Sequence, residues 1–164
     1  MGTLNLSSTV SLTPSILESP AFYVARTTTQ SITDQTWTKI ELTDDNSSAF
    51  DTNGCWDNSN YRFTPTLAGY YQIQFTCSVS NGALRAGRIA IYKNGSAWNQ
   101  AEFYDSNANS DDKYDDLCLS VSGLIYFNGT TDYVEFFAWR REGNGSVGGS
   151  SDRCQASGFL ARQA

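Results

Sequence analysis

The sequence predicts an all-β protein, and two observations carry that prediction. The first is composition: aromatic residues make up 13% of the 164 residues and charged residues only 17%, while Asn, Gly, Ser and Thr are abundant. Aromatic and β-branched side chains suit pleated sheets, whereas Asn, Gly and Ser suit turns. The second is pattern: short apolar runs alternate with turn clusters, and no 3.6-residue period is sustained. We expect one domain, folded as a sandwich or jelly roll.

Residues 1–20 differ from the rest of the chain, and we expect them to form an extended arm in front of a jelly-roll domain at 21–164. Every apolar position named below lies two or four residues from the next, so the side chains share one face of an extended segment. An arm lying on a neighbouring subunit is one interpretation, and a frayed tail is the other. The arm residues are Leu4, Leu6, Val10 and Leu12.

The clearest strand is predicted at 70–79. Apolar and polar residues alternate along it, so one face is expected in the core and the other outside. The expected core face consists of Tyr71, Ile73, Phe75, Cys77 and Val79.

Turn signals place the other strands. Asn94-Gly95 between 88–93 and 96–100 predicts a two-residue hairpin turn. A second hairpin is predicted at 128–132, and the Gly/Ser-rich stretch 143–151 is predicted to be a flexible loop. The remaining strands are expected at 21–26, 36–42, 117–127, 133–140 and 156–161.

Charge and composition exclude several function classes. The net charge of −6 without a basic cluster argues against nucleic acid as a partner. The absence of histidine excludes Ser-His-Asp and Cys-His catalysis and histidine-ligated zinc. No apolar run reaches the roughly 20 residues of a membrane helix, and we expect no membrane partner. None of the four cysteines forms a C-x-x-C pair, so a zinc ribbon has no support.

Short motifs between residues 21 and 162 keep the order and spacing of a known domain. They include Ala21-Phe22, Phe50-Asp51, Phe63-Thr64-Pro65, Gly69-Tyr70-Tyr71-Gln72-Ile73-Gln74-Phe75, Ile91-Tyr92-Lys93-Asn94-Gly95, Val121-Ser122-Gly123, Asp132-Tyr133-Val134 and Ser157-Gly158-Phe159-Leu160. Together they resemble the complement first-component-q globular head, a member of the tumour-necrosis-factor-like superfamily. The resemblance implies a ten-strand jelly-roll β-sandwich that assembles as a homotrimer. The stretch 124–135 is also similar to head-like domains in virion proteins of tailed bacteriophages.

The strand predicted at 133–140 is apolar on both faces, which predicts burial on both sides. In the resembling family this strand lies in the inner sheet, whose second face meets the threefold axis. We therefore expect a trimer interface here, with loops of the same chain as the alternative cover. The expected interface residues are Gln72, Gln74, Tyr133, Phe137 and Trp139.

Two kinds of chemistry could use the acidic residues. The loop at 105–116 contains D-x-N-x-N, and its alternating oxygen ligands suit calcium, although it lacks the glycine and glutamate of an EF-hand loop. A solvated acidic loop is the default. A glycosidase would need two facing carboxylates, for which Glu41, Glu102 and Glu135 are the strand candidates; we expect no enzyme and no cofactor. The candidate calcium ligands are Asp105, Asn107, Asn109 and Asp116.

These expectations converge on a virion surface protein located on the capsid. A trimeric decoration (cement) protein would clamp neighbouring subunits of the major capsid protein through its arms. Twenty extended residues reach at most about 65 Å, which suits bridging on a shell. The alternatives are a tail-fibre or receptor-binding knob that recognises a host surface ligand, which would normally need a longer shaft, and a bacterial or secreted ligand-binding protein.

Overall fold

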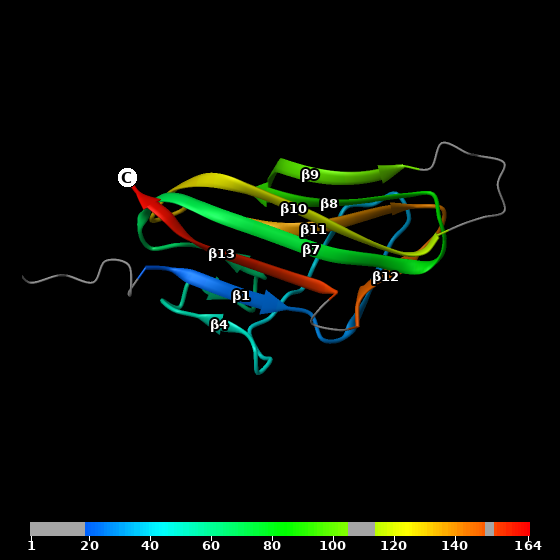
Figure 1. Ribbon diagram of the computed structural model, residues 1–164, viewed down its shortest axis with the longest axis horizontal. Helices are drawn as coiled ribbons and strands as arrows, with labels where there is room; N and C mark the ends of the chain where they lie inside the picture. The colour runs from blue at the N-terminus through cyan, green and yellow to red at the C-terminus, as the bar shows by residue number, and fades with distance from the viewer. Residues whose placement is uncertain (1–18, 105–113, 150–152) are drawn as a thin grey trace, which may run out of the picture.

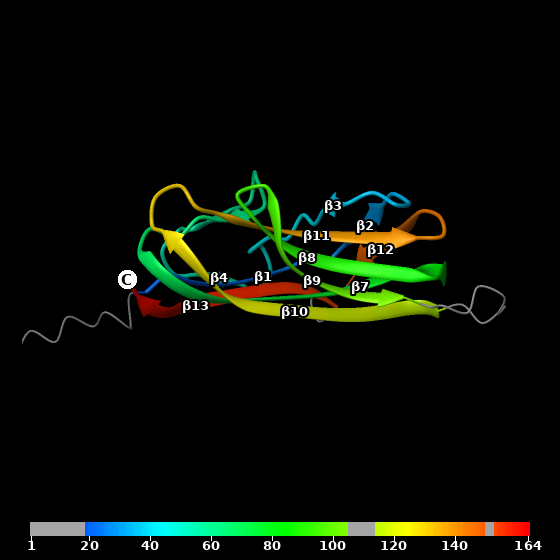
Figure 2. The same cartoon turned by 90° about the horizontal axis from the view of Figure 1, so that it is seen from above.

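The computed structural model describes residues 19–104, 114–149 and 153–164, and for 81–84 and 114–115 the backbone alone. Over these residues the chain forms thirteen β-strands and no helix. The strands pair antiparallel in two sheets that lie face to face, as Figures 1 and 2 show. The all-β jelly-roll prediction is confirmed.

The larger sheet has seven strands, and the long strand β7 is at its centre. One edge of β7 pairs with β10, and the other pairs with β12 and β13. Beyond that second edge, β12 pairs with β2, and β13 pairs with β1, which in turn pairs with β4. The strands are β1 (Ala21–Ala25), β2 (Thr29–Ile32), β4 (Phe50–Asp51), β7 (Ala68–Leu84), β10 (Tyr114–Asn128), β12 (Gly145–Gly148) and β13 (Cys154–Gln163).

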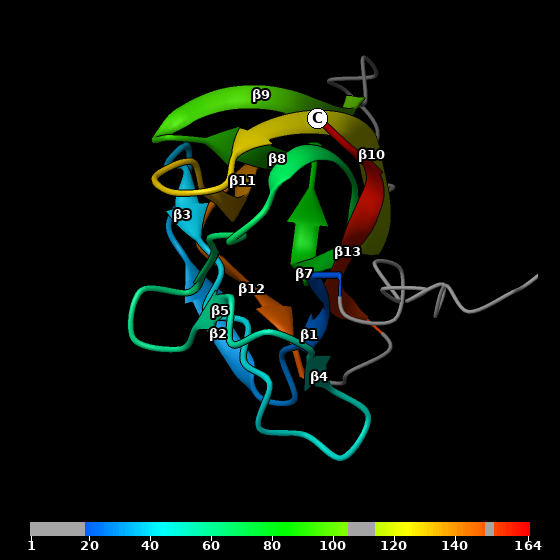
Figure 3. The same ribbon diagram turned by 90° about the vertical axis from the view of Figure 1, so that its left-hand side faces the viewer.

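The smaller sheet has six strands in the order β5-β6-β11-β8-β9, and β3 also pairs with β11. Figure 3, which looks along the sandwich, shows β9 of this sheet beside β10 of the other, so the two sheets approach each other along that edge. The strands are β3 (Thr38–Lys39), β5 (Trp56–Asp57), β6 (Arg62–Phe63), β8 (Ala86–Lys93), β9 (Ser96–Tyr104) and β11 (Val134–Arg141).

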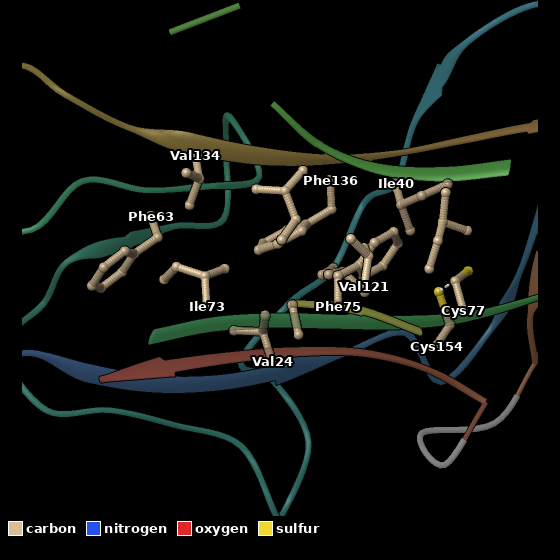
Figure 4. Packing of buried hydrophobic residues seen from close by; sticks show 14 of the residues in the cluster. Val24, Ile40, Phe63, Ile73, Phe75, Cys77, Val121, Val134, Phe136 and Cys154 are labelled. Atoms are coloured by element: carbon tan, nitrogen blue, oxygen red, sulfur yellow. Dashed lines mark hydrogen bonds between the residues drawn. The ribbon is translucent and has the colours of Figure 1, made fainter. Parts of the chain in front are cut away.

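The core lies between the sheets and is aromatic (Figure 4). Phe22 stacks on Phe63 with 4.3 Å between ring centroids, and Phe75 lies 5.0 Å from Phe136 across the sandwich. The alternation predicted for 70–79 is confirmed, because every second residue from Tyr71 to Val79 is fully buried. Aromatic pairs at these distances stabilise a core beyond the burial of their surface.

The hairpin predicted at Asn94-Gly95 is confirmed, since β8 ends and β9 begins around this pair. Asn94 and Gly95 have φ angles of 51° and 77°. Two successive positive φ angles are what a type I′ turn requires, and Asn-Gly is the dipeptide that adopts them most easily.

The second predicted hairpin is wrong. The strands on either side of 128–132 belong to different sheets, because β10 pairs with β7 and β11 pairs with β8. The Asn128 side chain sets the crossing: its Oδ1 accepts hydrogen bonds from the backbone N–H groups of Thr130, Thr131 and Asp132. These bonds turn the chain from one layer to the other.

The Gly/Ser-rich stretch predicted as a loop contains a strand. Residues Gly145–Gly148 form β12, which lies between β2 and β7. Small residues are needed here because the Arg140 side chain fills the space beside Gly145. A glycine-rich composition therefore indicates close packing at this position rather than a loop.

Candidate functional site: an uncharged sheet face

The outer face of the seven-stranded sheet is built from alternate residues of β10, β7, β13 and β1 (Figure 1). The register aligns these residues in rows across the sheet. One row runs from Leu124 through Gln72 to Phe159, and the next runs from Tyr126 through Tyr70 to Arg162 at the edge of the face. We call this surface the uncharged face; it consists of Tyr23, Tyr70, Gln72, Gln74, Thr76, Cys118, Ser120, Ser122, Leu124, Tyr126, Gln155, Ser157 and Phe159.

Four large apolar side chains stand in water on one half of this face. Leu124 is 52% exposed and Phe159 54%, while Tyr70 and Tyr126 are both more than 40% exposed. The two tyrosine rings contact each other, with 5.4 Å between their centroids. Neighbouring exposed groups of this size form a patch of the kind that marks an interaction site.

The other half of the face is polar, and two pairs of its side chains bond to each other. The Tyr23 hydroxyl donates to Oε1 of Gln155, and Oγ1 of Thr76 donates to Oγ of Ser120 over 3.0 Å. Since these groups are already paired, covering them would leave few hydrogen bonds unmade.

No residue of the uncharged face carries a formal charge, although the chain has 28 Asp, Glu, Lys and Arg residues. Charges stand at its border: the exposed Arg162 lies opposite Tyr70 at one end, and Arg153 donates to Asp116 over 2.6 Å at the other. Depletion of charge together with enrichment in aromatic residues is the composition of the buried centre of a protein–protein interface.

The outer face of the six-stranded sheet has the opposite character. Lys39 pairs with Glu135, and Arg88 pairs with Glu102, both across neighbouring strands. The Arg88 guanidinium also covers the Trp139 ring at 4.7 Å. Ion pairs over half-buried aromatic rings are typical of a solvated surface.

The structure divides the predicted interface residues between these two faces. Gln72 and Gln74 lie on the uncharged face, but Tyr133, Phe137 and Trp139 lie on the outer face of the six-stranded sheet. The five expected interface residues therefore belong to two different sheets, because β11 pairs with β8 and not with β7 or β10.

The second apolar face of β11 is partly covered by its own chain, which was the alternative. Arg62 lies 4.9 Å from the ring centroid of Tyr133, and the ring centroids of Phe137 and Tyr92 are 4.2 Å apart. This burial raises the pKa of the Tyr92 hydroxyl. The alternation of β11 therefore has an explanation within one subunit.

Two other predicted groups fall largely outside the described residues. One is the arm, whose residues Leu4, Leu6, Val10 and Leu12 lie outside the described ranges. The other is the set of calcium candidates, of which Asp105, Asn107 and Asn109 lie outside them. The fourth candidate, Asp116, accepts hydrogen bonds from Arg153 and Ser78. Within the described ranges, no three His, Cys, Asp or Glu side chains gather closely enough to hold a metal ion.

The three carboxylates considered for glycosidase chemistry do not face one another. Each pairs with a cation instead: Glu41 with Arg26, Glu102 with Arg88, and Glu135 with Lys39. A glycosidase needs two carboxyl groups on either side of one bond, and these residues give no such pair. No helix in the described part of the chain could span a membrane.

Solved structures share this architecture. Eiger TNF from S. frugiperda superposes with a TM-score of 0.66, covering 89% of this chain and 95% of that one at 6% sequence identity. The fold is a TNF-like jelly roll. Murine APRIL superposes with TM-scores of 0.63 and 0.62 at pH 5.0 and pH 8.5, again at 6% identity, covering 87% and 86% of this chain and 98% of that chain in both cases. No protein-family model and no curated protein matches the chain.

The TNF-like fold confirms the predicted resemblance at the level of architecture. Sequence reasoning missed the apolar part of the uncharged face, which is Tyr70, Leu124, Tyr126 and Phe159. A signal for two of them was present: Leu124 and Tyr126 alternate with Ile125 and Phe127, which are buried. A strand with large apolar groups in both phases has a second face to cover.

Proposed function

We propose that the protein is a non-enzymatic, trimeric surface protein of a tailed-phage particle, and that it decorates the capsid by clamping neighbouring subunits of the major capsid protein. The proposal that the protein is a trimer rests on one observation, the uncharged face. The capsid location is supported by the similarity of 124–135 to phage virion proteins and by the apolar periodicity of the arm.

The occupant proposed for the uncharged face is the same face of two further copies. A surface without charge is complementary to itself, since it brings no like charges together. Three copies related by a threefold axis close into a ring in which one part of the face on each copy meets a different part of the face on the next. This model keeps Gln72 and Gln74 in the interface and adds Leu124, Tyr126 and Phe159.

The Tyr133, Phe137 and Trp139 side chains are not part of the interface that we propose. They lie on the far side of the sandwich, where two of the rings are covered by Arg62 and Arg88 and the Phe137 ring packs on Tyr92. A Trp139→Ala variant should therefore keep the oligomeric state of the full chain.

Light scattering on the full chain tests the trimer. We expect a mass about three times the 18.0 kDa of the chain. Phe159→Glu should lower that mass, because it places three carboxylates in the interface. Tyr104→Glu is the matched control, since Tyr104 is 58% exposed at the end of β9, in the other sheet. A monomeric wild-type chain, or equal masses for both variants, would refute the proposed interface.

Sedimentation with undecorated capsid shells tests the location. The full chain should pellet with the shells, and a chain lacking residues 1–20 should remain trimeric but stay in the supernatant. Loss of the arm removes three tethers at once, so the loss of avidity should be large. If the truncated chain pellets equally well, the arm is not the clamp. If neither chain binds shells and both adhere to host cells, the protein is a receptor-binding knob.

A further inference from the structure

Two cysteines meet in the core of the larger sheet. Cys77 is on β7 and Cys154 is on β13, and the register places them directly opposite each other. Both are fully buried, and their Sγ atoms are 2.6 Å apart. Figure 4 shows the two sulfur atoms pointing toward each other between the strands.

The hydrogen-bond pattern of the two strands decides whether a covalent bond fits here. The Ser78 N–H donates to the Arg153 carbonyl over 2.7 Å, which makes this a hydrogen-bonded pair. Pairs alternate along an antiparallel ladder, so Cys77 and Cys154, one step further, form a non-hydrogen-bonded pair. The Cα atoms of such a pair are about 4.5 Å apart, within the range of about 4.4–6.8 Å that disulfides span.

The remaining cysteines have other surroundings. Cys55 is buried beside Asn53 and Thr66, and Cys118 is exposed on the uncharged face. Neither shares a register position with the 77/154 pair, so the strand pairing selects a single combination.

We propose that Cys77 and Cys154 form a cross-strand disulfide when the protein is folded in the presence of a small-molecule disulfide such as oxidised glutathione. The thiolate of one cysteine attacks the glutathione disulfide and releases one glutathione thiol. The second cysteine then attacks the mixed disulfide and releases the other. The protein loses two protons and two electrons, and one glutathione disulfide is reduced to two thiols.

The bond has to form before β13 docks on β7, or during local opening of that edge. Burial raises the pKa of the Cys77 thiol well above its ordinary value, and a protonated thiol is a poor nucleophile. The folded, reduced protein should therefore be oxidised slowly. The folded, oxidised protein should resist reduction, because an external thiolate cannot reach the two buried sulfur atoms. The bond is a structural staple and not an exchangeable switch.

The staple should stabilise the fold because it closes the long loop from 77 to 154. A cross-link over a loop of this length removes much of the entropy of the unfolded chain. For a domain of this size we expect the melting temperature to rise by about 10 °C.

Thiol counting on the full chain tests the proposal. The protein is refolded with oxidised glutathione and denatured in excess N-ethylmaleimide, and the mass of the intact chain is measured by mass spectrometry. We expect two maleimide adducts, and a linked peptide pair containing Cys77 and Cys154 after digestion. Four adducts would overturn the proposal, and so would a linked pair that involves Cys55 or Cys118.

Two variants separate the staple from general effects of the thiols. Cys55→Ser/Cys118→Ser retains only the proposed pair, so it should take up no maleimide after refolding with oxidised glutathione. When the same variant is refolded with a phosphine reductant instead, its melting temperature should be about 10 °C lower. Cys77→Ala/Cys154→Ala should show no such dependence. Equal responses of the two variants would refute the proposed bond.

Discussion

A single methyl group added at Gly145 should destabilise the whole sandwich. A Cβ atom at this position would lie 1.7 Å from Nη1 of Arg140 and 2.6 Å from the Ser80 carbonyl oxygen. Arg140 is fully buried, and its Nη1 donates to that same oxygen over 2.9 Å, while Nη2 donates to the Glu142 carbonyl. Both the methyl group and the guanidinium need the same space, so Gly145→Ala must displace the arginine.

The expected cost follows from those contacts. Losing a hydrogen bond from a charged donor to Ser80 costs about 1.5–3 kcal/mol. Forcing one extra carbon into a packed site costs about 1–3 kcal/mol. Gly145→Ala should therefore lower the free energy of unfolding by about 2.5–6 kcal/mol, a large part of the roughly 5–15 kcal/mol that holds a typical domain folded.

Urea unfolding followed by tryptophan fluorescence, at one fixed protein concentration, measures this cost. Gly143→Ala is the matched control: Gly143 has a φ of +89° but no atom within 4 Å of an added Cβ, so it reports backbone strain without a clash. The strain alone should cost about 1–2 kcal/mol. In an Arg140→Ala background, the cost of Gly145→Ala should fall by about 1.5–3 kcal/mol, because the guanidinium is gone.

Either of two results would refute this reasoning. The first is a Gly145→Ala protein as stable as the Gly143→Ala control. The second is an unchanged cost in the Arg140→Ala background, which would mean that the methyl group and the arginine do not compete.

Three further outcomes are expected. Gly123→Leu should lower the melting temperature and shift tryptophan emission to the red, because an added Cβ would lie 2.4 Å from the Trp98 ring that covers the edge between β9 and β10. Burial raises the pKa of Asp132, but hydrogen bonds led by the one from Asn94 outweigh this effect and leave the pKa below its ordinary value. The stability that this carboxylate adds is present above the unfolded pKa of about 3.9 and is lost as pH falls through the folded pKa. The difference in free energy of unfolding between wild type and Asp132→Asn, measured in urea, should therefore shrink on acidification. Deleting residues 1–20 should leave the circular dichroism spectrum and melting temperature of the domain nearly unchanged, because the sheets begin at β1; a large loss of either would show that the arm is part of the fold.

Local patterns in the sequence predicted local structure well. The alternation from Tyr71 to Val79 gives the buried face of β7, because side chains of a strand point alternately to its two sides. The Asn94-Gly95 pair predicts the turn between β8 and β9, because few other dipeptides adopt two positive φ angles in succession. Both signals depend on neighbouring residues only.

Which sheet a strand joins depends on distant residues, and here the prediction failed. The alternation of β11 indicates two apolar faces whether it pairs with β7 or with β8, so the sequence pattern alone could not place Trp139. The pairing of Cys77 with Cys154 is equally hidden, since a shift of one residue in register would turn one of them to the outside. The apolar part of the uncharged face was missed for the same reason: Phe159, Gln72 and Leu124 become neighbours only through the strand order.

The position of the chain ends gives the proposed trimer a direction. The N–H of Leu160 donates to the Pro20 carbonyl, so the start of β1 and the end of β13 lie at one end of the sandwich, on the left in Figure 1. The exposed Phe159 and Tyr70 lie on the half of the uncharged face that is nearest to this end. A threefold axis keeps equivalent atoms at one height, so all three copies of residue 20 would lie at the same height along it. A trimer closed through the uncharged face would therefore start its three arms at one level. That is the arrangement in which three weak tethers bind together, and it predicts that capsid attachment depends on the uncharged face as strongly as on the arm.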